Sequence, residues 1–307
     1  MTKDLLGIKE LSLDDINMIL DTASHFKEVL KRDIKKVPTL RGKTVVNLFS
    51  EPSTRTKLSF ELAAKRLGTD VLNFSFSTSS VIKGESLKDT ALTIEALGAD
   101  YVVIRHGSSG LPHFLAGHIG ASVINAGDGT NEHPTQALID LFTIKEKKGP
   151  IEGLKVAIVG DIKHSRVAKS DIYGLTKLNA EVRLIGPTTL IPPKIESLGV
   201  EVYNNMEDGL RGADVIIMLR VQRERQSGCF FSTEKEYFRY WGLTEQKLTH
   251  AKENAIVMHP GPTNRGIEID YHIADSHRSV ILEQVTNGIA IRMAVLYLLS
   301  NLSTTPP

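Results

Sequence analysis

Residues 44–68, TVVNLFSEPSTRTKLSFELAAKRLG, place a strand-like run, a cluster of hydrogen-bond donors and a helix-like run next to one another. The first six residues are mostly apolar and rich in valine, as in a buried strand, whereas the last part has apolar residues at helical spacing. Between them lie Ser53, Thr54, Arg55 and Thr56. The first N–H groups of a helix are unpaired and carry the positive end of its dipole, and these side chains add hydroxyls and a guanidinium. The junction therefore predicts a binding site for phosphate.

Junctions between a strand and a helix that contain serine or glycine have other interpretations besides a phosphate site. A plain Ser or Thr N-cap beside a surface arginine would also account for residues 53–56. A nucleoside triphosphate is not predicted, because the Gly-x4-Gly-Lys-Ser/Thr pattern is missing. The run LKVAIVG at 154–160 also ends in glycine before a helix-like segment, but Asp161, Lys163 and His164 stand where a dinucleotide loop needs further glycines. No nicotinamide cofactor is expected.

Composition is that of an ordinary soluble protein. The 307 residues are 41% hydrophobic and 24% charged, and 37 basic residues balance 36 acidic ones, so binding to nucleic acid or to a membrane surface is not expected. The only cysteine, Cys229, excludes an internal disulfide and a site with several thiolate ligands. The N-terminal 23 residues are interpreted as an amphipathic helix, and the apolar run at 289–299 is short and contains Arg292. We expect a cytoplasmic protein.

Short apolar, β-branched runs alternate with helix-like segments along the chain, which is typical of parallel α/β layers. The runs are residues 44–49, 100–105, 121–126, 154–160, 181–186, 214–219 and 255–260. Pro134 suits a helix start and Gly149-Pro150 a helix end, so a helix is predicted to join two halves. The apolar C-terminal helix is predicted to pack on the first half. The predicted domains are residues 1–133 with 286–307, and residues 134–285.

Polar and basic residues follow these runs repeatedly. They are SEPSTRT after 49, RHG at 105–107, AGDGTNEHPTQ at 126–136, DIKHSR at 161–166, RVQRER at 220–225 and HPGPTNRG at 259–266. Open parallel sheets bind ligands at the carboxyl ends of their strands. Because the clusters come from both halves, we expect one cleft between two domains that binds a strongly anionic ligand. No metal is expected, since neither His133 nor His259 has a partner His or Cys at ligand spacing.

Six blocks resemble, in order, the catalytic chains of the aspartate carbamoyltransferase family, from about residue 40 to the C-terminus. They are SEPSTRTKLSFELAAKRLG at 50–68, SSVIKGESLKDT at 79–90, INAGDGTNEHPTQALIDLFTI at 124–144, VGDIKHSRVAKS at 159–170, DVIIMLRVQRER at 214–225 and MHPGPTNRGIEI at 258–269. The resemblance implies transfer of the carbamoyl group of carbamoyl phosphate to the α-amino group of L-aspartate, giving N-carbamoyl-L-aspartate and phosphate in de novo pyrimidine biosynthesis. It implies no organic cofactor and no metal.

The resemblance also implies roles for matched residues. Phosphate would be bound by Ser53, Thr54, Arg55 and Thr56. The carbamoyl oxygen would receive donors from Thr56, Arg105 and His133, the catalytic set. The carbamoyl NH2 would contact Gln136 and the backbone around Pro260, Gly261 and Pro262. The carboxylates of aspartate would be bound by Arg166, Arg220 and Gln222. Ser79, for carbamoyl phosphate, and Lys83, for aspartate, would come from a neighbouring subunit, which implies a homotrimer.

Two alternatives stay open at this point. Ornithine carbamoyltransferases share the Ser-Thr-Arg-Thr and His-Pro-x-Gln blocks but typically carry His-Cys-Leu-Pro where this chain has His259-Pro260-Gly261-Pro262, and a cationic acceptor would sit badly beside Arg220. A non-catalytic homologue that scaffolds partner enzymes is the other alternative, and a decayed copy would be expected to lose site residues. Regulatory subunits or other pyrimidine-pathway enzymes as partners leave no mark that can be read from the sequence. The segment at 229–248 is interpreted either as a loop closing over the aspartate side or as a partly packed surface excursion.

Overall fold

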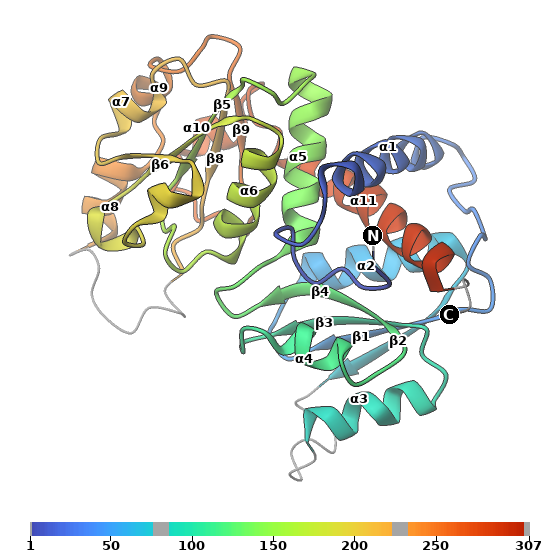
Figure 1. Ribbon diagram of the computed structural model, residues 1–307. Helices are drawn as coiled ribbons and strands as arrows, with labels where there is room; N and C mark the ends of the chain where they lie inside the picture. The colour runs from blue at the N-terminus through green and yellow to red at the C-terminus, as the bar shows by residue number, and fades with distance from the viewer. Residues whose placement is uncertain (1, 76–85, 223–232, 304–307) are drawn as a thin grey trace. The chain divides into compact units, whose positions relative to one another are not determined.

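The computed structural model describes residues 2–75, 86–222 and 233–303. The chain divides into two compact units, which we call the first unit, Met1–Ile139 with Val285–Pro307, and the second unit, Asp140–Gln284 (Figure 1). The domain limits given above stay a prediction.

The first unit contains a parallel sheet whose strands, within the described residues, follow the order β2-β1-β3-β4. The strands are β1 (Thr44–Phe49), β2 (Asp70–Ser75), β3 (Tyr101–His106) and β4 (Ser122–Asp128). The helices are α1 (Leu13–Leu30), α2 (Thr54–Leu67), α3 (Leu87–Ala96), α4 (Leu111–Ala116) and α11 (Ile281–Ser303). In Figure 1, α3 and α4 lie on one face of the sheet, and α1, α2 and α11 lie on the other. Such two-sided cover explains why the central strands β1 and β3 are apolar over most of their length.

Helix α11 provides much of the interior of the first unit. By length and composition, Ile281–Leu302 could cross a membrane, but more than half of its most apolar window is buried inside the protein. Its fully buried side chains include Ile291, Met293 and Leu296. Residues 290–296 are buried in succession, on every side of the helix, which accounts for the apolar character of this stretch, as expected for a core helix.

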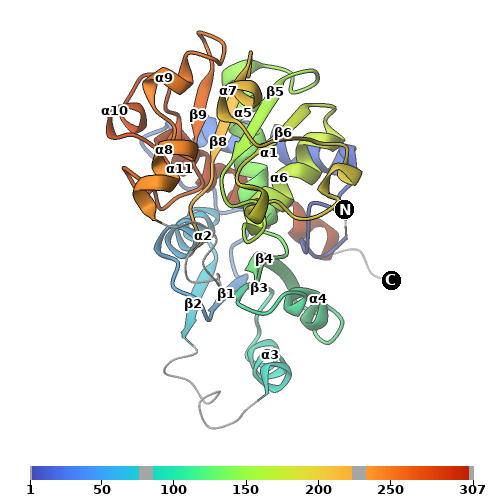
Figure 2. The same ribbon diagram turned by 90° about the vertical axis from the view of Figure 1, so that its left-hand side faces the viewer.

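The second unit contains a parallel sheet with the strand order β7-β6-β5-β8-β9 in the described part of the chain. The strands are β5 (Lys155–Val159), β6 (Glu181–Ile185), β7 (Glu201–Tyr203), β8 (Val215–Met218) and β9 (Ile256–Met258). The α-helices are α5 (Pro134–Lys148), which begins in the first unit, α6 (Arg166–Lys177), α7 (Met206–Leu210), α8 (Glu234–Trp241), α9 (Glu245–Leu248) and α10 (Tyr271–Ala274), and two 3-10 turns span Thr188–Leu190 and Ile195–Leu198. Figure 2 shows the central strands β5 and β8 next to each other, with β9 beyond β8.

All seven predicted strands are present, and the prediction of two parallel α/β halves is confirmed. Two strands were not predicted, β2 and β7, and each lies at the edge of its sheet. The prediction of a helix from the first residues onward was wrong, because α1 begins only at Leu13, where Ser12 and Asp15 form a capping box. Before that, Leu5 pairs with Ile124 beside β4.

The interpretation of residues 229–248 as a loop was wrong from Glu234 onward, whereas a partly packed surface segment agrees with the mostly exposed or half-buried residues there. Helices α8 and α9 form there, since Thr233 and Thr244 accept hydrogen bonds from the first turns as N-caps. Residues 229–232 lie outside the described residues.

Candidate functional site

The predicted phosphate cluster occupies the start of α2, directly after β1. Ser53 is the N-cap residue of this helix, but its side chain makes no capping hydrogen bond. The plain N-cap interpretation therefore does not explain this serine. The first turn contains no acidic residue, and Thr56 is buried, with 7% of its surface exposed, whereas Thr54 and Arg55 are exposed. A helix N-terminus without an acidic residue or a side-chain cap retains its attraction for an anion.

Arg105 lies near the end of β3, next to the end of β1. The parallel register places it opposite Phe49, and its backbone oxygen accepts hydrogen bonds from Ser50 N at 3.0 Å and Ser50 Oγ at 3.2 Å. Its Nη1 donates to the Ala126 oxygen at 3.1 Å, and its Nε lies 3.4 Å from Glu51 Oε2. These contacts hold the guanidinium from two sides, through Glu51 in the loop after β1 and through Ala126 in β4. The geometry fixes the orientation of a planar donor group.

Arg292, on α11, adds a third arginine to this part of the first unit. Its guanidinium lies 4.9 Å from the ring centroid of Phe60, its Nη1 donates to the Gly288 oxygen at 2.9 Å, and the residue is 3% exposed. Burial, together with repulsion from Arg105 and Arg55, lowers the pKa of Arg292 to about 9. A cation destabilised by two others marks a place where an anion would be stabilised. One signal in the sequence points to this residue, a charge inside the apolar run at 289–299.

His133 lies at the end of the loop that joins β4 to α5. Asp128, fully buried, organises this loop by accepting hydrogen bonds from Asn125 Nδ2 at 2.8 Å, from Glu132 N at 3.1 Å and from Gly110 N at 2.7 Å. Glu132 in turn accepts a hydrogen bond from Ile8 N at 2.7 Å. His133 is 4% exposed, and its backbone oxygen accepts from Gln136 N at 2.9 Å, so the two predicted residues share the first turn of the helix.

Arg166, in the second unit, is the first residue of α6, and Asp161 organises the loop before it. Ser165 caps the helix by accepting a hydrogen bond from Ala168 N at 3.2 Å, and Arg166 is 2% exposed. Asp161 is fully buried and accepts a hydrogen bond from His164 N at 3.2 Å. His164 Nδ1 lies 2.8 Å from the same oxygen.

Arg220 and Gln222 follow β8, whose neighbours in the sheet are β5 and β9. Gln222 Nε2 donates to the Arg220 oxygen at 3.3 Å, and Gln222 N donates to Asp161 Oδ2 at 3.3 Å. Both side chains are half-buried. Two planar donor groups at the carboxyl end of one strand match the geometry of a carboxylate ligand.

Gly261 and Pro262 follow β9, the neighbour of β8. Gly261 has a φ of +62°, which favours glycine, and its N–H donates to His259 Nδ1 at 2.8 Å. His259 is buried, and its backbone N–H donates to Gln284 Oε1 at 3.0 Å. Hydrogen bonds of the buried His259, and not regular secondary structure, thus stabilise the conformation of this loop.

In the first unit the charges of Arg55 and Arg105 act on Arg292, and in the second unit Gln222 N donates a hydrogen bond to Asp161. Ser79 and Lys83, predicted from the resemblance, lie outside the described residues, as do Arg223, Arg225 and Cys229. Among residues 2–75, 86–222 and 233–303, no group of three or more His, Cys, Asp or Glu could hold a metal ion.

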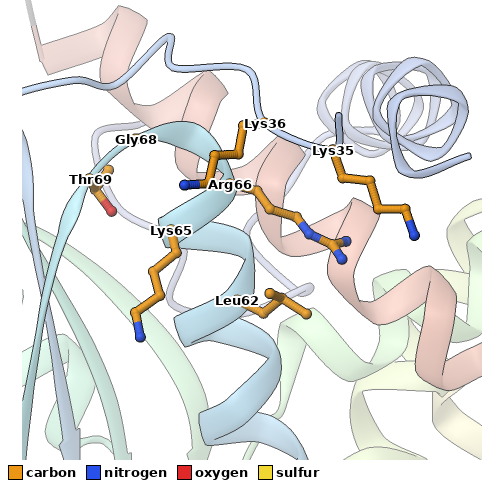
Figure 3. A pocket seen from close by; sticks show the side chains of 7 residues that line it. All are labelled: Lys35, Lys36, Leu62, Lys65, Arg66, Gly68 and Thr69. Carbon is orange, nitrogen blue, oxygen red and sulfur yellow. The ribbon is translucent and has the colours of Figure 1, made fainter. Parts of the chain in front are cut away.

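A separate pocket of about 580 Å³ lies beside the C-terminal end of α2 in the first unit (Figure 3). Its lining residues are Lys35, Lys36, Leu62, Lys65, Arg66, Gly68 and Thr69. None of them is a predicted site residue. Lys65 is paired with Glu61 at 2.6 Å. This pocket is therefore distinct from the phosphate cluster at the opposite end of the same helix.

Comparison with known proteins covers almost the whole chain. Residues 3–146 match the aspartate/ornithine carbamoyltransferase carbamoyl-P binding domain, and residues 152–299 match the Asp/Orn binding domain of the same family. The chain is 61% identical over 297 residues to the aspartate carbamoyltransferase catalytic subunit of Moorella thermoacetica, covering 97% of each chain. It is 59% identical over 298 residues to that of Halothermothrix orenii, covering 97% of this chain and 95% of the relative.

Solved structures give the same result. Aspartate transcarbamoylase from Trypanosoma cruzi, in complex with N-(phosphonacetyl)-L-aspartic acid, superimposes with a TM-score of 0.87 at 29% identity and covers 96% of this chain and 94% of its own. Ornithine carbamoyltransferase from Pyrococcus furiosus superimposes with a TM-score of 0.85 at 31% identity and covers 95% of each chain.

Proposed function

The chain belongs to the aspartate/ornithine carbamoyltransferase family, and on that premise we propose that it transfers the carbamoyl group of carbamoyl phosphate to the α-amino group of L-aspartate. The products are N-carbamoyl-L-aspartate and phosphate. The observation that carries this conclusion is the identity of 61% and 59%, over nearly the full length, to catalytic subunits named aspartate carbamoyltransferase. This reaction, which the name of the matched catalytic subunits implies, is a step of pyrimidine biosynthesis.

The first unit binds carbamoyl phosphate in this proposal. Ser53, Thr54, Arg55 and Thr56 hold the phosphate at the start of α2, where the helix has no acidic residue in its first turn. The electrostatic effect of Arg105 and Arg55 on the pKa of Arg292 supports this assignment, because three guanidinium groups close enough to repel one another would attract a dianion. Arg292 acts there through its charge.

The carbamoyl group is oriented by residues at the ends of β3 and β4. Thr56, Arg105 and His133 direct donors at the carbamoyl oxygen, on which negative charge grows as the amine attacks. Gln136 and the backbone at Gly261 and Pro262 accept hydrogen bonds from the carbamoyl NH2, which an acetyl group lacks. Anchoring of Arg105 by Ala126 and Glu51 supports a fixed donor direction.

Aspartate is bound by the second unit through Arg166, Arg220 and Gln222. Its two carboxylates require two sets of donors, and guanidinium forks suit them. The aspartate nitrogen attacks the carbamoyl carbon, the bond from that carbon to the phosphate oxygen breaks, and the departing phosphate takes the proton that the amine loses. Carbamoyl phosphate is already activated, so the residues orient the reactants and stabilise the tetrahedral oxyanion.

Aspartate is favoured over ornithine as the acceptor. Matched catalytic subunits at 56–61% identity carry the name aspartate carbamoyltransferase, whereas the ornithine carbamoyltransferase from Pyrococcus furiosus is 31% identical. Proline at position 260 and the arginine at 220 agree with a dicarboxylate acceptor.

The assembly is a homotrimer in this proposal, with Ser79 and Lys83 contributed by a neighbouring subunit, and the protein acts in the cytoplasm. Larger assemblies with regulatory or other pathway subunits are compatible with the same catalytic chain.

Sedimentation of the purified chain measures the trimer directly. Mixing an inactive Lys83→Ala chain with an inactive Arg105→Ala chain should restore part of the activity. In a shared site, Arg105 from the first chain and Lys83 from the second can together form one active site with all of its residues intact.

The test of function is an assay of the purified protein with carbamoyl phosphate and either L-aspartate or L-ornithine. Product is expected with aspartate alone. Arg220→Ala should raise the KM for aspartate at least about tenfold, because a charged hydrogen bond is worth roughly 1.5–3 kcal/mol. Arg211→Ala, a change at an exposed arginine paired with Asp208, is the matched control. Product with ornithine instead, or with neither amine, contradicts the proposal.

A further inference from the structure

Glu268 is a carboxylate with no exposed surface that lies beyond the end of β9 in the second unit. It accepts hydrogen bonds from three N–H groups. Its Oε1 accepts from Val221 N at 2.9 Å and from Asn264 Nδ2 at 2.8 Å, and its Oε2 accepts from Asn264 N at 2.8 Å. A buried carboxylate must be compensated in this way, because desolvation of an ionised group is costly.

The donors belong to two different loops. Val221 lies between Arg220 and Gln222, in the segment that follows β8, and Asn264 comes two residues after Pro262, in the segment that follows β9. One side chain therefore ties together the ends of two adjacent strands of the sheet. Val221 N and Asn264 N are backbone groups, so the Glu268 carboxylate fixes the course of both loops. It also holds the side chain of Asn264.

Glu268 is enclosed by other buried polar groups. His259 Nε2 lies 3.9 Å from its Oε2, and both side chains are fully buried. Tyr237 is also buried, and burial, followed by the charges of Glu268 and Asp161, raises the pKa of its hydroxyl. With no exposed surface, Glu268 cannot contact a substrate, and any effect it has on the reaction passes through the residues that it holds.

We propose that Glu268 is a positioning residue for the acceptor substrate, because it holds the backbone of residues 220–222 so that Arg220 and Gln222 are aligned for the two carboxylates. This inference rests on the proposed function. Pre-aligned donors bind without the entropy cost of ordering them, so loss of the anchor should weaken aspartate binding more than binding of a phosphate group. The phosphate residues 53–56 belong to the first unit, whereas Glu268 belongs to the second.

The experiment compares Glu268→Gln with Glu253→Gln, a change at an exposed glutamate of the same unit. The amide keeps one acceptor but presents an NH2 group toward a backbone N–H, so at least one hydrogen bond to a charged acceptor is lost. The KM for L-aspartate should rise about tenfold or more, while the dissociation constant of inorganic phosphate changes by less than about threefold. Hydrogen–deuterium exchange of the peptide that contains residues 215–222 should become faster. The Glu253→Gln protein should match the wild type in all three.

An unchanged KM, an equal loss in aspartate and phosphate binding, or unchanged exchange of residues 215–222 overturns the proposal. If Glu268→Gln does not fold, Asn264→Ala decides, since it removes only the 2.8 Å bond to Glu268 Oε1 and should raise the KM for aspartate about threefold. A wild-type protein that forms no carbamoyl aspartate refutes the proposed function instead. In that case the exchange rate alone decides whether Glu268 holds residues 220–222.

Discussion

Replacement of Arg105 by lysine keeps a positive charge at the end of β3 and removes the planar fork. The fork makes two anchoring contacts, a charged hydrogen bond of 3.1 Å to the Ala126 oxygen and a 3.4 Å contact to Glu51. The first is worth about 1.5 kcal/mol, and the second about 0.5 to 1 kcal/mol, because both partners are partly exposed. A lysine cannot make both contacts and also reach a carbamoyl oxygen. The energy of the two contacts that orient the donor, about 2 to 2.5 kcal/mol in total, is therefore lost.

That loss corresponds to a fall of about 30- to 70-fold in kcat/KM for carbamoyl phosphate. The assay is the initial rate at saturating L-aspartate over a range of carbamoyl phosphate concentrations, with the melting temperature measured on the same preparations. Arg41→Lys, at an exposed arginine of the same unit, is the control and should leave both unchanged. A change of less than threefold in a folded Arg105→Lys protein would refute the reasoning, because charge alone would then suffice.

Other features of the structure lead to further predictions. Burial and repulsion from Asp140 raise the pKa of Asp171 well above its usual value, so the folded state binds this proton more tightly than the unfolded state. Wild-type stability should therefore fall as the pH rises from about 4 through that raised pKa, whereas Asp171→Asn should lack this fall when urea unfolding is measured across the same range. Lys247 Nζ donates to the oxygens of residues 239 and 242 at 2.8 Å each, at the end of α8, so Lys247→Met should lower the free energy of unfolding by about 1–2 kcal/mol and the exposed Lys235→Met should not. Gly129 has a φ of +48°, and a Cβ there would overlap a neighbouring loop, so Gly129→Ala should cost at least about 2 kcal/mol and lower the melting temperature by several degrees, whereas an unchanged value would contradict the strain.

The strands that could be predicted from the sequence are those whose hydrophobic runs are continuous. The runs at 44–49, 100–105 and 154–160 belong to strands with a neighbour on each side and covered on both faces, so nearly every residue is apolar. The two strands that were missed, β2 (Asp70–Ser75) and β7 (Glu201–Tyr203), lie at sheet edges. Unlike β4 and β9, which also lie at sheet edges but are buried throughout, β2 and β7 are partly exposed, and their sequences, DVLNFS and EVY, mix polar and apolar residues.

The helix predicted before Leu13 was wrong because this segment pairs with a strand instead. The residues before Leu13 have apolar spacing that fits a helix, but Leu5 N donates to the Val123 oxygen at 2.9 Å, and Asn125 N donates to the Leu5 oxygen at 2.9 Å. Pairing with β4 satisfies the backbone groups of this segment in place of a helix. Only the capping box at Ser12 and Asp15 marks the true start of α1.

By itself, the sequence determined the alternation of strands and helices, the helix that begins at Pro134, and the clusters of donors that follow the strands. These features depend on neighbours in the chain: side-chain periodicity, proline geometry and the residue types at strand ends. The order of the strands decided the rest. Arg292 feels the charge of Arg105, 187 positions away, only because α11 lies beside α2 in the first unit, and Glu268 reaches Val221, 47 positions away, only because β8 and β9 are neighbours. No local pattern encodes such encounters, because they arise from burial and strand pairing of the whole unit.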